Sequence, residues 1–355
     1  MVRVPTLKQL QSSAVSMDRW NGVFKVQLHP NAENYYRIAT SLCFSLSFRS
    51  LIAPSANAIF FNGDRVQGTR NPVVERLSDP QNIAEVLASK FGGSVNVWII
   101  EASIFNGPFA VYKDFIPSVN GYGSLIVFSC GFPASATTVS LLSNCLQHAK
   151  NAISSEPKKP SSVSLSSLQP PKTLIIGFSK GGTAVNQLVT ELGSLEDDAP
   201  VNPSRVREQQ PGVDELSVVQ EEIQMIPTTK ESLLNSITEI HYVDVGLNSS
   251  GAYITDKNVI ESISKRLLGG GAQGIRFVLH GTPRQWCDSR RTWIRDEKER
   301  LYRLLESEAQ RSGGRLKVYE RFYFADRTPD MQMHFEVIQK WMLVDCIVCT
   351  FLCCL

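Results

Sequence analysis

The stretch Thr173-Leu174-Ile175-Ile176-Gly177-Phe178-Ser179-Lys180-Gly181-Gly182 decides the fold of this chain. A short apolar, β-branched run leads into a Gly-x-Ser-x-Gly turn, and an amphipathic helical pattern follows directly. This strand–turn–helix context is typical of a nucleophile elbow, in which Gly177 and Gly181 let strand and helix pass close together. The Ser179 hydroxyl would then project from a sheet, with the first N–H groups of the helix facing the group it attacks. The alternative is an ordinary glycine-rich turn with an incidental serine.

Apolar runs on both sides of this stretch predict a sheet. Residues 57–61 and 95–100 are short, nearly all-apolar runs, as expected for strands covered on both faces, and a helical pattern lies between them. Further strands are predicted at 237–245, 275–280 and 316–324, again with helical patterns between them. Strand, helix and strand in this order imply an α/β protein with a mostly parallel sheet and helices on both faces.

Composition excludes several classes of protein. The chain has 355 residues, of which 43% are hydrophobic and 20% charged, with 36 basic and 34 acidic residues. A net charge of +2 indicates neither nucleic acid nor an acidic membrane surface as an obligate partner. No apolar run reaches the roughly 18 residues of a membrane helix, and no secretory signal is recognisable. The first thirty residues are slightly basic, so we expect a mitochondrial or cytoplasmic protein that is not secreted.

The chain is expected to form one main domain. Residues 1–20 are predicted to be a flexible N-terminus, and 21–340 a single domain with mobile insertions near 154–171 and 195–229. Residues 341–355 form an apolar, cysteine-rich tail without a histidine at zinc-ligand spacing. We therefore expect no metal and no cofactor. The oligomeric state is not predictable from these features.

A serine hydroxyl needs a base to remove its proton and an acid to orient that base. His334 follows the last predicted strand by about ten residues, in what reads as a polar loop, where the base of an elbow enzyme belongs in the order serine, acid, histidine. His280, which ends a strand, is the second candidate for the base.

Two aspartates compete as the acid. Asp244 closes the strand after the elbow helix, although an Asx-type turn would also explain it. Asp288 follows the next strand, and a helix N-cap would be a sufficient reason for an aspartate there. We expect Asp244 or Asp288 to orient the histidine.

Acyl transfer also needs hydrogen-bond donors where negative charge develops on oxygen. The backbone N–H of Lys180, directly after the serine, is one predicted donor. The turn Asn62-Gly63-Asp64, which ends an earlier buried strand, is predicted to supply the second. The side chain of Lys180 is expected to be solvated.

Collinear blocks of the chain resemble an uncharacterised eukaryotic family of serine-hydrolase-like proteins, named after an open reading frame on human chromosome 2. The matching blocks are residues 61–67, 82–99, 177–181 with 186–188, 242–244, 282–285 with Asp288 and 293–294, and 334–337. The resemblance is greatest to a plant-type branch. It implies an α/β-hydrolase-like fold with a Ser–Asp–His triad, no established substrate, and a human member regarded as mitochondrial.

These features together predict a serine hydrolase that acts on a small-molecule or lipid ester, thioester or amide through an acyl-serine intermediate. The rival is a catalytically inactive, hydrolase-like scaffold that binds a lipid or protein partner in mitochondria. Residues 122–130 and 340–355 do not look like family sequence, and we interpret both as products of an alternative gene model. Supported coding exons across both segments would contradict that interpretation.

Overall fold

The predicted apolar runs assemble into one central sheet. The computed structural model describes residues 18–119, 131–153, 170–195, 224–269 and 273–341. Nine strands of that part form the sheet in the order β1-β2-β5-β4-β8-β9-β10-β11, with β3 paired to β2. Their bounds are Asp18–Val26 (β1), Tyr36–Ser45 (β2), Ser50–Leu51 (β3), Ala56–Asn62 (β4), Val95–Glu101 (β5), Lys172–Phe178 (β8), Ile237–Val243 (β9), Ile275–Gly281 (β10) and Leu316–Phe322 (β11).

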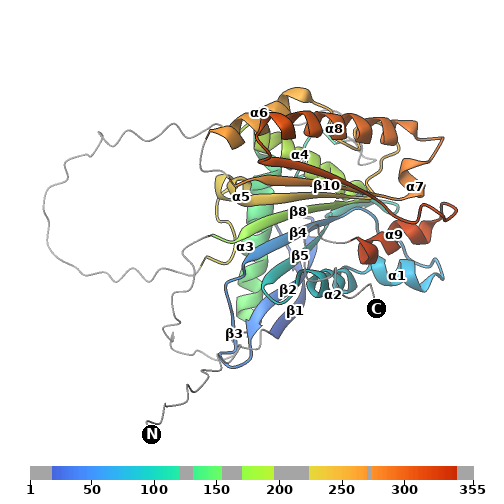
Figure 1. Cartoon of the computed structure of the whole chain (residues 1–355). Helices are drawn as coiled ribbons and strands as arrows, with labels where there is room; N and C mark the ends of the chain where they lie inside the picture. The colour runs from blue at the N-terminus through green and yellow to red at the C-terminus, as the bar shows by residue number, and fades with distance from the viewer. Residues whose placement is uncertain (1–17, 120–130, 154–169, 196–223, 270–272, 342–355) are drawn as a thin grey trace, which may run out of the picture.

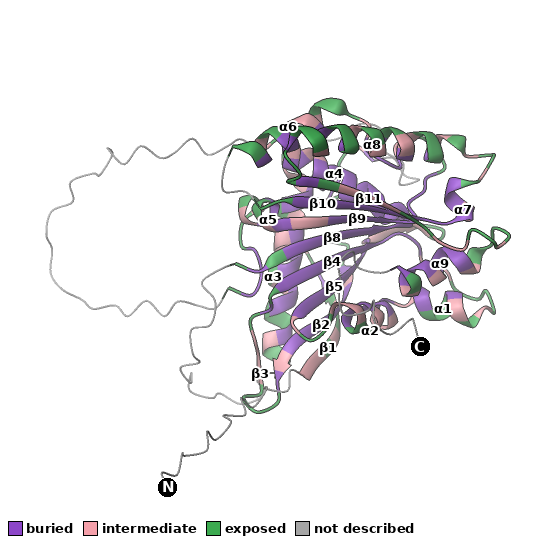
Figure 2. Ribbon diagram, in the orientation of Figure 1, coloured by how far each residue is buried: buried purple, intermediate pink, exposed green. Residues whose placement is uncertain are grey.

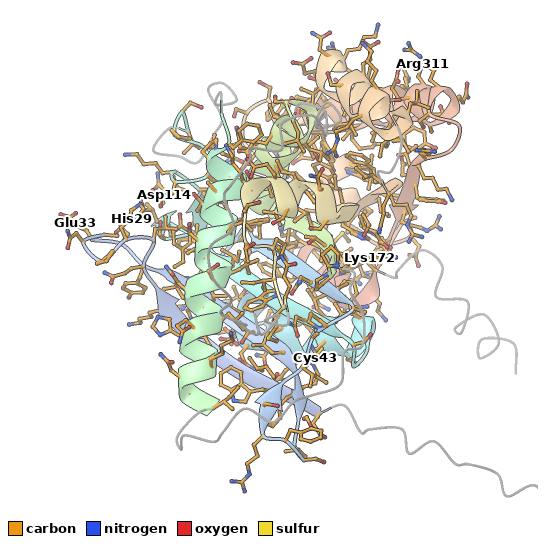
Figure 3. The ribbon with its side chains drawn as sticks, turned by 90° about the vertical axis from the view of Figure 1, so that its left-hand side faces the viewer. His29, Glu33, Cys43, Asp114, Lys172 and Arg311 are labelled. Carbon is orange, nitrogen blue, oxygen red and sulfur yellow. The ribbon has the colours of Figure 1, made fainter. Side chains whose placement is uncertain are left out.

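Six consecutive strands of this sheet are parallel. Strands β5, β4, β8, β9, β10 and β11 run in one direction. Strand β2 is antiparallel to β5, β1 is antiparallel to β2, and both extend the sheet beyond β5. The carboxyl ends of the parallel strands therefore meet at one edge of the sheet, on the right in Figure 1. Figure 3 looks onto the opposite edge, where Lys172 begins β8. The prediction of a mostly parallel α/β sheet is confirmed.

Helices cover both faces of the sheet (Figure 1). On one face lie α1 (Pro72–Ser78), α2 (Pro80–Phe91) and α9 (Met331–Lys340). On the other lie α3 (Pro133–Ile153), α4 (Gly182–Gly193), α5 (Lys230–Ser236), α6 (Lys257–Leu268), α7 (Pro283–Trp286) and α8 (Thr292–Arg311).

Each face of the sheet has its own hydrophobic core. Successive strand residues point to opposite faces, so Phe60 packs with α1, α2 and α9 while Phe61 packs with the helices of the other face. Every residue of β4 and β5 is buried, which explains their nearly continuous apolar sequence. Figure 2 shows this burial along the central strands, with exposed residues on the outer sides of α6 and α8.

The segment that carries His334 differs from the sequence prediction. It is the first turn of α9, whereas a polar loop was expected, and that part of the prediction was wrong. The Asp330 side chain accepts a hydrogen bond of 2.6 Å from the Met333 N–H and starts the helix. Phe335 and Val337 then pack into the core of that face. The helix is only ten residues long, so its apolar face is too short to be clear in the sequence.

The predicted insertions and tail are only partly described. Residues 154–169, 196–223 and 342–355, together with the atypical stretch 122–130, lie outside the described residues. At the end of the second insertion Met225 and Ile226 are buried, and Met225 accepts a hydrogen bond of 3.1 Å from the Asn57 side chain. That end therefore belongs to the packed core.

Candidate active site

The sharp turn after β8 places Ser179 at the carboxyl edge of the sheet. Ser179 has φ +50°, a conformation that residues with a Cβ rarely adopt, and a 3-10 turn (Ser179–Gly181) leads into α4. A Cβ on Gly177 would come within 2.8 Å of the Gly182 Cα, and one on Gly181 would overlap the carbonyl oxygen of Phe61. The glycines on both sides of the serine are therefore required by the close approach of neighbouring backbone.

Asp244 and His334 meet at the same edge. Asp244 follows β9, the neighbour of β8, and His334 reaches in from α9. The Nδ1 atom of His334 is 2.6 Å from Oδ2 of Asp244. Asp244 also accepts 2.7 Å and 3.0 Å hydrogen bonds from the backbone N–H and the hydroxyl of Thr282, which hold its carboxylate in place.

Asp64 lies between the serine and the histidine. The Ser179 hydroxyl donates a 2.8 Å hydrogen bond to Oδ2 of Asp64, and Nε2 of His334 is 3.2 Å from the same oxygen. The side chains thus form one chain of contacts in the order Ser179, Asp64, His334, Asp244. The sequence suggested Asp64 only as a backbone donor, and its carboxylate was missed. The available signal was an acid directly after a buried strand, but the contact depends on β4 being the neighbour of β8.

The ionisable side chains of this series of contacts, Asp64, His334 and Asp244, are buried. Burial by itself lowers the pKa of His334, but its hydrogen bonds to Asp244 and Asp64 outweigh that effect and leave the pKa raised. Burial likewise lowers the pKa of the Lys180 ammonium, and the charge of Asp64 opposes this in part. The Lys180 side chain is buried against Phe109, with Nζ 4.5 Å from the ring centre, so the expectation of a solvated side chain was wrong.

The turn that contains Asn62, Gly63 and Asp64 is tied to a hairpin, β6 (Ile104–Asn106) and β7 (Phe109–Val111). The Gly63 carbonyl accepts a 3.0 Å hydrogen bond from the Ala110 N–H. A Cβ on Gly63 would overlap the Phe178 carbonyl and the Lys180 N, so the turn packs directly against the elbow. The predicted oxyanion donors therefore lie beside Ser179, and their function as donors remains a prediction.

Asp288 and His280, the other acid and the other base that the sequence suggested, have different hydrogen-bond partners. Asp288 accepts 2.9 Å hydrogen bonds from the Arg290 N–H and the Arg291 side chain, but the N-cap of α8 is Arg291, so the N-cap alternative for Asp288 was wrong. His280 is buried with its ring nitrogens 3.1 Å from His241 and 3.0 Å from the Tyr323 hydroxyl. Burial and the charge of His241 lower the pKa of His280 well below its usual value. Neither residue is bonded to Ser179 or to His334.

Ser179 and His334 are almost fully shielded from solvent. Ser179 is 3% exposed and His334 1% exposed. The turn that follows Asp64 lines a polar cleft of about 320 Å³ between Arg37, Arg65, Gln67 and Asp79.

The His334 contacts make stability depend on pH. His334 contacts Asp244 and Asp64 only in the folded protein, and these contacts raise its pKa above the ordinary value of 6.5. The stabilisation is therefore complete below pH 6.5 and is lost as the pH rises through the folded-state pKa. We expect the difference in unfolding free energy between wild type and His334→Gln to shrink as the pH rises above about 6.5, with a slope of at most about 1.4 kcal/mol per pH unit. Urea titrations at several pH values measure this, and a difference independent of pH would contradict it.

A mostly parallel sheet with helices on both faces and a serine on a sharp strand–helix turn defines the α/β-hydrolase fold. No protein-family model matches the chain. It is 23% identical over 301 residues to "Mitochondrial protein C2orf69 homolog" of Danio rerio, covering 80% of this chain and 73% of the relative. It is also 23% identical over 328 residues to "Mitochondrial protein C2orf69" of Homo sapiens, covering 80% and 74%.

Several solved hydrolases resemble the structure at a distance. The siderophore hydrolase EstA from Aspergillus nidulans matches with a TM-score of 0.41 and 14% identity, covering 96% of this chain and 97% of that chain. An IroE-like serine hydrolase from Shewanella oneidensis matches with a TM-score of 0.40 and 8% identity, covering 91% and 78%. The fold assignment rests on the strand order and elbow of this chain itself. Among the described helices, none is both long and apolar enough to cross a membrane.

Proposed function

We propose that this protein is a serine hydrolase that cleaves an ester, thioester or amide through an acyl-Ser179 intermediate. The observation that carries the proposal is the continuous chain of contacts from Ser179 through Asp64 and His334 to Asp244, at the carboxyl edge of the sheet. Ser179 is the nucleophile, and His334, oriented by Asp244, belongs to the group of side chains that activates it. The Lys180 N–H stabilises the oxyanion, with the Asn62–Asp64 turn beside it as the source of a second donor.

The substrate is proposed to be a small molecule or lipid that carries an acyl group. The solved structures of similar fold are hydrolases by name, and the two relatives are named mitochondrial proteins. Because these two relatives are named mitochondrial proteins, a mitochondrial location is proposed for this chain as well. Membership of a plant-type branch remains a prediction from the sequence. Imaging of a tagged full-length chain tests the location.

A fluorophosphonate probe tests the reaction. Because such probes react with activated serines, we expect the purified protein to be labelled and Ser179→Ala to remove the labelling completely. Ser249→Ala is the matched control, since among the described residues its hydroxyl is hydrogen-bonded only to the neighbouring Ser250 carbonyl. We expect this control to be labelled at the wild-type rate.

The alternative is a hydrolase-like scaffold that binds a lipid or protein without cleaving it. The near-complete burial of Ser179 is the observation in its favour. A folded wild-type protein that resists the probe, as judged by circular dichroism and a cooperative thermal transition, would support the scaffold and contradict the hydrolase.

A further inference from the structure

The feature that the proposed reaction leaves unexplained is the carboxylate of Asp64. A serine hydroxyl that is ready to react donates its hydrogen bond to the group that will take its proton. Here that acceptor is Oδ2 of Asp64 at 2.8 Å. Among the described residues, the hydroxyl of Ser179 has no hydrogen bond to His334.

His334 is placed to donate from both of its ring nitrogens. Nδ1 is 2.6 Å from Oδ2 of Asp244, and Nε2 is 3.2 Å from Oδ2 of Asp64. An ionised carboxylate can only accept, so both contacts are hydrogen bonds when the ring carries both protons as imidazolium. Asp244 already accepts from the Thr282 N–H at Oδ1, which is consistent with its ionised form. In this arrangement the imidazole has no lone pair directed at Ser179.

Asp64 is held firmly enough to act on the serine. Gly63 packs against the elbow backbone, and Arg65 donates a 2.8 Å backbone hydrogen bond to Pro108 of the adjoining hairpin turn. Oδ1 of Asp64 is buried and has no hydrogen-bond partner among the described residues. The Ser179 proton moves along its existing hydrogen bond to Oδ2, and Oδ1 takes no part in that transfer.

We propose that Asp64 is a catalytic residue, and that its carboxylate, in place of the imidazole of His334, takes the proton of Ser179. This inference rests on the proposed hydrolase function and specifies how its nucleophile is activated. His334 remains protonated and holds the Asp64 carboxylate through Nε2–H, while Asp244 holds His334 through Nδ1–H. The titratable groups that interact with Asp64 are His334 from α9, through a contact of 3.2 Å, and, through charge alone, Lys180 from the elbow and Tyr112, whose hydroxyl donates to the carbonyls of Asn62 and Ile100.

The protons balance in this scheme. In acylation the Ser179 O–H bond breaks, its proton moves to Asp64, and Oγ bonds to the acyl carbon while the carbonyl electron pair moves onto oxygen. When the bond to the leaving group breaks, that group takes the proton from Asp64. Water then gives a proton to Asp64 as it attacks the acyl carbon, and Ser179 regains that proton as the acid is released.

The first test compares rates of fluorophosphonate labelling in Asp64→Asn and wild type. The asparagine keeps the shape of the side chain but cannot take up a proton, so we expect labelling at least about 100-fold slower, the usual effect of losing a general base. Asp256→Asn is the matched control, because asparagine caps α6 as aspartate does. We expect the control to react at the wild-type rate.

The second test uses wild type alone and so does not depend on a variant folding. Nuclear magnetic resonance follows the protonation of His334, and labelling rates are measured over the same pH range. If Asp64 is the base, labelling stays near its maximal rate at pH values where His334 is still protonated. If the imidazole is the base, the rate falls about tenfold for each pH unit below the pKa of His334.

The outcomes separate this inference from the proposed function. Wild type that is labelled at Ser179, together with a slow Asp64→Asn and rates independent of His334 protonation, supports the Asp64 role. An Asp64→Asn protein that is labelled as fast as wild type or faster overturns it and leaves the hydrolase intact, as does a rate that follows the His334 titration. A folded wild type without labelling removes the hydrolase and the Asp64 role together.

Discussion

Replacing Asp244 by asparagine is expected to slow fluorophosphonate labelling of Ser179 by about 100-fold or more, because His334 loses the carboxylate that orients it against Asp64. The carboxylate accepts from the Thr282 N–H, the Thr282 hydroxyl and His334 Nδ1, all within 3.0 Å. An asparagine offers one acceptor oxygen in place of two, so either the Thr282 N–H or the His334 N–H faces an amide hydrogen. The imidazolium also loses its ionic partner, so we expect the pKa of His334 to fall.

Stability should fall in the same variant. Asp244 is fully buried, and hydrogen bonds to a buried charge contribute about 1.5–3 kcal/mol each. We expect the free energy of unfolding to drop by about 2 kcal/mol or more. Labelling rates and urea titrations are to be compared with Asp288→Asn, the variant of the other acid suggested by the sequence. Slow labelling of Asp288→Asn with normal labelling of Asp244→Asn would reverse the assignment.

Replacing Gly181 by alanine is expected to lower the free energy of unfolding by about 3 kcal/mol or more, the upper range for overpacking a rigid interior. Its Cβ would overlap the Phe61 carbonyl oxygen and lie 2.7 Å from the Phe61 carbonyl carbon. Phe61 is fully buried within β4, between β5 and β8, and cannot move aside without disturbing the sheet. Movement of the elbow instead would displace Ser179 from Asp64.

Gly68→Ala is the matched control for the Gly181 variant. Gly68 has φ +71° with no atom within 4 Å of an added Cβ, so alanine there introduces backbone strain without a clash. We expect it to cost about 1 kcal/mol. Urea titration of both variants measures the difference, and equal stabilities would show that the backbone at the elbow yields easily.

Local patterns in the sequence were enough to predict most strands near the site. The apolar runs at 57–61, 95–100 and 275–280 are observed as β4, β5 and β10, each extended by one or two residues. These strands are covered on both faces, so nearly every residue must be apolar, which makes the pattern strong. Helix α9 was missed because a short helix with one packed face carries a much weaker signal.

The sequence by itself determined the elbow around Ser179, because the sharp turn, the flanking glycines and the buried strand before it are all local requirements. It also narrowed the partners to two aspartates and two histidines, each at a strand end or in the segment that follows one. Only the tertiary structure decided that Asp244 and His334 contact each other, while Asp288 and His280 have other partners. It alone placed the Asp64 carboxylate between Ser179 and His334. The reason is that β4, β8 and β9 become neighbours through pairings between distant segments, which no local pattern encodes.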